Sequence, residues 1–198
     1  MSGVRRQIDA DLLTSAEVER LISACSRRAP TGIRNAALLA VLWRCGLRAG
    51  EVVALAAKDV ELDEGRLVVQ NGKGGRRRVV GIDAGTRALI EQWLGRRRKL
   101  GIPGRVLFCT LSGGSLQTSY LRHLMPRLAR KAGIERRCHP HALRHRFAVD
   151  LVSEGASLTT VRDLLGHSSA ATTSVYLSRI GASEAVEFAR QREWGGAR

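Results

Sequence analysis

His141, Arg144 and His145 have the spacing that places side chains on one face of a helix. Residues three and four positions apart lie above one another on a helix, so this face presents two imidazoles beside a guanidinium. Two histidines four residues apart also occur in the zinc site of H-E-x-x-H proteases. Here the glutamate of that motif is absent, and Arg144 would bring a cation beside the metal. The missing glutamate and the presence of Arg144 therefore disfavour zinc binding.

A glycine-histidine pair at Gly166 and His167 is followed nine residues later by Tyr176. Individually, a tyrosine in a helix is most often part of the packing, and a Gly-His pair most often marks a turn. Attack on a phosphodiester would give these groups a shared purpose. Arginine forks bind both non-bridging oxygens and neutralise their charge. A phenol of pKa about 10 needs a base or a positive site to attack, and the leaving alkoxide needs a proton donor.

Neither the acidic residues nor the cysteines have the spacing of a metal site. The densest acidic group, at residues 59–64, falls at a turn beside a strand, where solvation explains it better than the converging carboxylates of a two-metal nuclease. The four cysteines contain no C-x-x-C pair, so we interpret them as buried or incidental thiols. We expect no metal and no other cofactor.

The charge of the chain is concentrated in two segments. The 198 residues carry 33 basic and 18 acidic side chains, a net charge of +15. Residues 66–105 contain eleven Lys or Arg and two acids, and residues 122–146 contain eight and one. An even spread would serve solubility equally well, so the clustering favours a polyanion, and nucleic acid in particular, as the partner.

No sequence feature indicates a membrane. There is no basic amphipathic anchor, no apolar run long enough to span a bilayer, and no signal-peptide core in residues 1–13. We therefore expect no membrane partner and a cytoplasmic protein, associated with the nucleoid if the source is a prokaryote.

The elements that must position these residues are mainly helical. The motif T-S-A-E at residues 14–17 predicts a capped helix start, and residues 33–44, apolar nearly all round, predict a buried helix. A short helix is expected at 49–57. Strands at 66–70 and 76–82 flank the turn N-G-K-G-G and predict a hairpin. Further helices are expected from Asp83 to about residue 99, and at 118–131, 140–154, 158–165, 170–178 and 183–192. The fold class is α+β, mainly helical with one small antiparallel sheet.

Five motifs occur in the order typical of the phage-integrase family of tyrosine recombinases, which this chain resembles over residues 14–178. They are CGLRAGE (45–51), GKG (72–74), HPHALRH (139–145), LLGH (164–167) and TTSVY (172–176). Each motif alone is weak, whereas the ordered set is specific. The resemblance implies a catalytic domain that cleaves and rejoins DNA through a 3′-phosphotyrosyl intermediate, without metal or ATP.

The resemblance also implies roles for individual residues. The catalytic set is Arg48 and Arg144 as the phosphate clamp, Tyr176 as nucleophile, Lys73 as general acid, His141 as base or proton relay, and His167 as a donor to the phosphate. Glu51 is expected to support the first arginine. His145 is expected to be structural or to touch the DNA backbone. Further DNA contacts are expected from the basic side chains Arg76, Arg77, Arg78, Arg122 and Arg146.

We expect residues 1–198 to form a single catalytic domain, with a lead-in at 1–13, a helical tail at 179–198 and no N-terminal core-binding domain. In these respects the chain resembles short bacterial integrases and fimbrial invertases. The expected partners are double-stranded DNA, a homo-tetramer formed on that DNA, and accessory DNA-binding proteins as an open alternative. A helix at 183–192 either interlocks subunits or packs on its own domain. Two other readings stay open: a type IB topoisomerase, and a DNA-binding regulator of the same fold that does not cleave.

Overall fold

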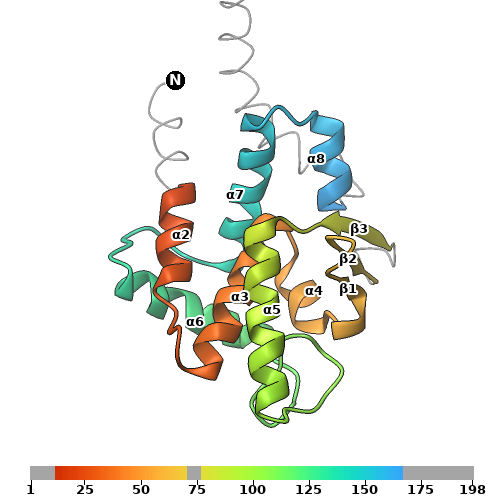
Figure 1. The fold of residues 1–198 in the computed structure, drawn as a ribbon. Helices are drawn as coiled ribbons and strands as arrows, with labels where there is room; N and C mark the ends of the chain where they lie inside the picture. The colour runs from red at the N-terminus through yellow and green to blue at the C-terminus, as the bar shows by residue number, and fades with distance from the viewer. Residues whose placement is uncertain (1–11, 71–76, 167–198) are drawn as a thin grey trace, which may run out of the picture.

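A computed structural model of the chain describes residues 12–70 and 77–166. This part is mainly helical with one three-stranded antiparallel sheet, which confirms the predicted α+β class (Figure 1). Its helices are α2 (Ser15–Ser23), α3 (Pro30–Arg44), α4 (Ala49–Ala54), η1 (Ala57–Asp59), α5 (Ala84–Lys99), α6 (Thr118–Lys131), α7 (Pro140–Ser153) and α8 (Leu158–Leu165). Its strands are β1 (Val60–Glu61), β2 (Arg66–Val69) and β3 (Arg78–Gly81). The helices expected at 170–178 and 183–192 lie outside the described residues.

Helix α3 runs through the centre of the described chain, packed against α5, α7, α2 and α4. Every residue from Gly32 to Trp43 is buried, as the apolar run predicted. The helix begins at Pro30, earlier than the periodicity indicated, because proline suits the first helical position, where no N–H is needed. It ends before Gly46, whose φ is +61°. A Cβ at Gly46 would lie 2.3 Å from the Phe147 ring, so this turn of the chain lies directly against α7.

Helix α4 is shorter than the predicted 49–57. Its backbone leaves the helix at Leu55 because the chain there pairs with the segment after α5: the amide of Leu107 donates to the carbonyl of Leu55 (2.7 Å), and the amide of Ala57 to that of Arg105 (2.9 Å). Long-range pairing thus replaces the last helical turn. The short helix keeps Arg48 at its N-terminal cap.

The sheet has the order β1-β2-β3 with antiparallel neighbours. The predicted hairpin of β2 and β3 is confirmed, with Leu67 opposite Val80 and Val69 opposite Arg78. Strand β1 was not predicted, because two residues are too short for a period to show. The connection between β2 and β3 at residues 71–76 lies outside the described residues.

Local capping signals are confirmed at two helices. Thr14 and Glu17 form the capping box of α2, and the Asp83 carboxylate accepts from the amide of Thr86 to begin α5. The basic run at the end of α5 is not wholly on the surface. Arg97 is 7 % exposed and donates to the carbonyls of Ile102, Pro103 and Val106, so its charge holds a loop.

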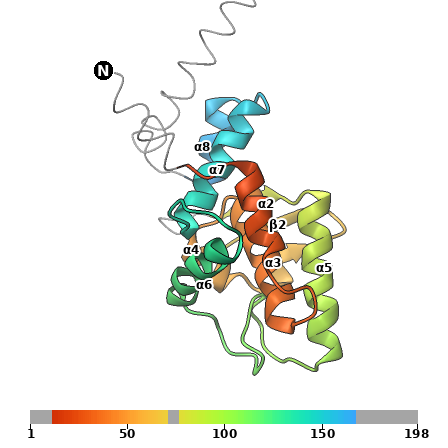
Figure 2. The same ribbon diagram turned by 90° about the vertical axis from the view of Figure 1, so that its left-hand side faces the viewer.

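Helices α7 and α8 stand side by side at the top of the molecule in both views (Figures 1 and 2). A small core joins them, formed by Phe147, Ala148, Val152, Val161 and Leu165. Helix α8 also contacts β3. It ends at Gly166, whose φ of +61° gives a left-handed C-terminal cap. The C-terminal end of α8 is thereby placed between α7, α4 and the sheet.

Candidate active site

Arg48 and Arg144, far apart in the sequence, meet at the C-terminal end of α8. Arg144 projects from α7, is 3 % exposed, and donates through Nη2 to the carbonyl of Leu165 (2.6 Å) and through Nη1 to that of Gly46. Arg48 donates through Nη2 to the carbonyl of Gly166 (3.2 Å). The side chain of Arg48 is 29 % exposed, so the clamp predicted from the sequence faces solvent through this arginine.

A third arginine binds the same helix end. Nε of Arg78, on β3, donates to the carbonyl of Leu164 at 3.0 Å. The last carbonyls of a helix have no partner within the helix and carry its partial negative charge. Three consecutive carbonyls, at residues 164–166, therefore each receive a different arginine, one from β3, one from α7 and one from the cap of α4.

Glu51 balances the charge of these arginines. Its side chain is 6 % exposed, and it accepts from the backbone amide and Nη1 of Arg48 (2.8 and 2.7 Å) and from Nη1 and Nη2 of Arg78 (2.9 and 2.7 Å). Nη1 of Arg144 lies 4.0 Å from the same carboxylate. Burial acts to raise the pKa of Glu51, but the hydrogen bonds from Arg78 and Arg48 outweigh it and lower the pKa to about 2. Three guanidiniums and one carboxylate leave two positive charges in excess.

Burial lowers the pKa of Arg144 to about 9, with the charge of Arg48 acting in the same direction. Arg144 nevertheless stays protonated at neutral pH. The site is thus a compact cationic centre held by backbone carbonyls, which is the electrostatic arrangement that a phosphate oxygen would meet.

Two of the predicted histidines share the first turns of α7. His141 is exposed, and its ring centroid lies 6.0 Å from that of His145, edge to face. Desolvation lowers the pKa of His141, and the charges of Arg144 and Arg48 lower it further. Burial, with His141 and His139 nearby, lowers the pKa of His145 to about 4. Both imidazoles are therefore neutral at neutral pH, and that of His141 is able to accept a proton.

The helix that carries these groups begins at a side-chain cap. Nδ1 of His139 accepts from the backbone amide of Ala142 at 3.2 Å, and Pro140 occupies the first turn. The H-P-H sequence thus sets the start of α7, and with it the direction of His141 and Arg144.

The five arginines predicted to contact DNA divide by exposure. Arg77 and Arg122 are exposed. Arg78 faces inward onto Glu51, and Arg146 faces Asp150 through Nε (2.7 Å) and Nη2 (2.6 Å). Arg76 lies outside the described residues.

Asp150, which the sequence reasoning did not single out, joins three helices. The residue is 8 % exposed, and its carboxylate also accepts from Nε1 of Trp43 on α3 (2.7 Å) and from the hydroxyl of Ser15 on α2 (2.9 Å). The one sequence signal available was the i, i+4 spacing to Arg146 on a helix. The contacts to α2 and α3 have no local signature.

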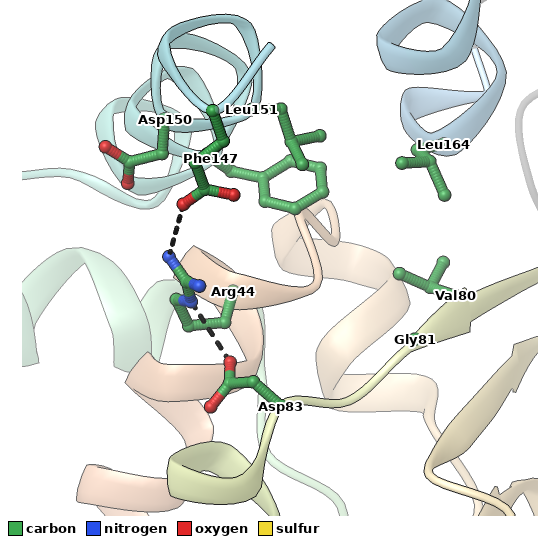
Figure 3. Close-up of a pocket in the computed structure, with 9 residues that line it drawn as sticks. Arg44, Val80, Gly81, Asp83, Phe147, Asp150, Leu151 and Leu164 are labelled. Carbon is green, nitrogen blue, oxygen red and sulfur yellow. Dashed lines mark hydrogen bonds and ion pairs between the residues drawn. The ribbon is translucent and has the colours of Figure 1, made fainter. Parts of the chain in front are cut away.

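Beside the arginine centre lies a pocket between the end of α3, β3, α7 and α8 (Figure 3). Val80, Phe147 and Leu164 give it an apolar wall. Arg44 lines the other side, with Nε 3.0 Å from the carboxylate of Asp83 and Nη1 3.6 Å from that of Glu154. These ion pairs tie α3 to α5 and α7 next to the site.

Three of the predicted catalytic residues, Lys73, His167 and Tyr176, lie outside the described residues.

Within residues 12–70 and 77–166, no group of three or more His, Cys, Asp or Glu side chains is arranged to hold a metal ion. No helix in that part of the chain is long and apolar enough to cross a membrane. The four cysteines are buried free thiols, and burial raises the pKa of Cys45 to about 12.

The described residues form a mainly helical α+β domain with a compact arginine centre, and comparison with known proteins assigns the family. A model described as "Phage integrase family" matches residues 11–180. The chain belongs to the phage integrase family.

Similar proteins are tyrosine recombinases by name. The chain is 38% identical over 167 residues to "Tyrosine recombinase XerD" of Ralstonia nicotianae, covering 83% of this chain and 54% of that protein. It thus spans about half the length of the curated relatives it matches. The crystal structure of XerA recombinase superposes with a TM-score of 0.80 at 29% identity, covering 92% of this chain and 66% of that one. A post-cleavage complex of XerH recombinase with its palindromic difH substrate superposes with a TM-score of 0.73 at 28% identity, covering 90% of this chain and 53% of that one.

Proposed function

We propose that the chain acts as a site-specific tyrosine recombinase, cleaving and rejoining double-stranded DNA by transesterification through Tyr176. The observation that carries the proposal is the convergence of Arg48 and Arg144 on adjacent carbonyls of one helix end, with Glu51 between them. A phosphodiester oxygen is a stronger acceptor for these guanidiniums than a neutral carbonyl, because it bears a full charge. Family membership supports the same assignment.

In this proposal the arginines neutralise the scissile phosphate and stabilise the pentavalent transition state. The oxygen of Tyr176 attacks phosphorus while the bond to the 5′-oxygen breaks, leaving a 3′-phosphotyrosyl link and a free 5′-hydroxyl. The neutral imidazole of His141 takes the phenol proton, and Lys73 gives a proton to the 5′-oxygen. His167 donates a hydrogen bond to the phosphate. Attack by the hydroxyl of another strand reverses the step and reseals the DNA without ATP.

The proposed partner is duplex DNA, held in a tetramer during strand exchange. The net charge of +15 and the exposed Arg77 and Arg122 support a broad phosphate contact, whose affinity falls steeply with salt. The similar XerH recombinase was crystallised with its difH substrate after cleavage. By the same reasoning we propose a cytoplasmic, nucleoid-associated location.

The test is covalent trapping on nicked suicide duplexes, with sequences taken from the DNA that flanks the protein's own gene. We expect a protein–DNA adduct at a 3′ end, which resists boiling in detergent and is absent for Tyr176→Phe. Supercoil relaxation without strand exchange would favour a topoisomerase. Duplex binding with no adduct on any substrate would leave a binding-only regulator.

A further inference from the structure

We propose that Arg78 is a positioning residue of the active site, which holds Glu51 and the end of α8 so that Arg48 and Arg144 are pre-oriented for phosphate. The inference rests on the proposed function, because its effect is on DNA cleavage. It gives Arg78 a role different from the direct DNA contact expected of the basic run at residues 76–78.

All three nitrogen atoms of Arg78 are directed into the protein. Nη1 and Nη2 bind the two oxygens of Glu51 as a fork, at 2.9 and 2.7 Å, and Nε binds the carbonyl of Leu164 at 3.0 Å. The side chain is 10 % exposed. An arginine whose fork is filled by a buried carboxylate has no free pair of donors for a DNA phosphate.

Arg78 contacts the groups that hold the two clamp arginines, whereas in the proposed function the clamp arginines themselves contact the DNA phosphate. Glu51, which Arg78 grips, is also the acceptor for the amide and Nη1 of Arg48. Leu164, its other acceptor, directly precedes Leu165 and Gly166, whose carbonyls bind Arg144 and Arg48. Gly166 also packs closely on Arg78: a Cβ there would lie 3.1 Å from its Cδ. One side chain of β3 therefore fixes both the carboxylate and the helix end that orient the two clamp arginines.

Without Arg78, the buried carboxylate of Glu51 would keep only its hydrogen bonds from Arg48. Glu51 would then be free to turn toward Arg48 or Arg144, and the end of α8 would lose its bond to the sheet. Misplacement of reacting groups by about 1 Å costs on the order of 10²-fold in rate. The expected defect is thus in the chemical step, with DNA affinity retained.

The decisive measurement is the single-turnover rate of adduct formation at saturating DNA, taken with the dissociation constant for the same duplex and its salt dependence. We compare Arg78→Ala, Arg78→Lys and the control Arg66→Ala. Arg66 lies on the neighbouring strand β2, is exposed, and pairs with Glu61, so the control removes one charge from the same sheet. We expect Arg78→Ala to react about 10²-fold more slowly than wild type, and Arg66→Ala to react at the wild-type rate.

The lysine variant separates a geometric role from a role of charge. Lysine keeps the positive charge but has no fork, so we expect Arg78→Lys to remain at least about tenfold slow, with affinity and salt dependence like those of Arg66→Ala. A wild-type rate for Arg78→Lys would overturn the inference. So would weakened binding with an unchanged rate at saturation, which identifies a DNA contact. Melting temperatures of both variants show whether the fold is kept, and the lysine variant carries the test if the alanine variant unfolds.

A double-mutant cycle with Glu51→Gln tests the route through Glu51. If Arg78 acts through that carboxylate, the variant that combines Arg78→Ala with Glu51→Gln reacts no more than about threefold more slowly than Glu51→Gln alone. Losses that multiply would contradict the route through Glu51. A wild-type chain that forms no adduct would overturn the proposed function and this inference together, whereas a reactive wild type with an equally reactive Arg78→Lys removes the inference alone.

Discussion

Arg48 and Arg144 donate to two adjacent carbonyl groups, those of Gly166 and Leu165, at the C-terminal end of α8. A helix end is an anionic pole of modest strength, so it orients the two guanidiniums without satisfying their full charge. In the proposed function, a phosphate approaching the exposed side of Arg48 would meet donors that are already aligned. Pre-orientation of this kind lowers the reorganisation that the transition state requires.

Replacing Arg144 with lysine tests whether the clamp works by its fork. The charge is retained, but one Nζ reaches either the carbonyls of Gly46 and Leu165 or the phosphate. We expect adduct formation at saturating DNA to slow by at least about 10²-fold, while affinity changes little. The measurement is single-turnover trapping, with the exposed Arg66→Lys as control. Wild-type kinetics for Arg144→Lys would show that charge alone is sufficient.

The pH dependence of cleavage should report His141. Its pKa is lowered from the usual 6.5 by desolvation and by Arg144 and Arg48, so the imidazole is neutral at pH 7 and is protonated only in more acidic solution. A protonated ring cannot take the phenol proton. We expect the rate to fall with decreasing pH through an apparent pKa below 6.5, and His141→Gln to be slow and to lack this limb. Persistence of the same limb in His141→Gln would assign it to another group.

The ionisation of Glu51 should make the free energy of unfolding depend on pH in the acidic range. Its pKa falls from 4.5 to about 2 on folding, so its contribution is fully present above pH 4.5 and is lost as pH falls toward 2. A shift of this size corresponds to about 3 kcal/mol. We expect Glu51→Gln to lower the free energy of unfolding by about that amount at pH 7, and by much less near pH 2. Urea unfolding across pH measures this, with the exposed Glu64→Gln as control. Equal losses at both pH values would contradict the assignment.

Asp150 should contribute to stability through its contacts with three helices. Asp150→Asn leaves Arg146 without a charged partner, next to Trp43 and Ser15. Breaking a buried ion pair costs about 3 kcal/mol. Denaturant unfolding at pH 7 checks this against Asp163→Asn, whose pair with Arg162 is exposed and is expected to matter by less than about 0.5 kcal/mol. Similar unfolding midpoints for the two variants would show that the contacts of Asp150 contribute little to the stability of the fold.

Much of the fold was predictable because its signals are local. The capping box at Thr14, the cap at Asp83 and the turn-flanked strands each arise from neighbouring residues, and each is found where it was expected. The departures come from long-range pairing: α4 stops early because Leu55 and Ala57 bond to the segment at residues 105–107. No local pattern contains that partner.

The sequence by itself determined the ordered motifs and the clustered charge, and from these it predicts Arg48, His141 and Arg144 as site residues and a polyanion as the partner. Only the tertiary structure decided which arginines are exposed and which are buried against other groups of the protein. Arg77 and Arg78 are adjacent and chemically identical, yet one is exposed and the other is bound to Glu51 and Leu164. The physical reason is that a guanidinium can be buried only where carboxylates and carbonyls converge to receive it. Around Arg78 on β3, these groups are Glu51 of α4 and the Leu164 carbonyl of α8, and only the packing of the three elements brings them together.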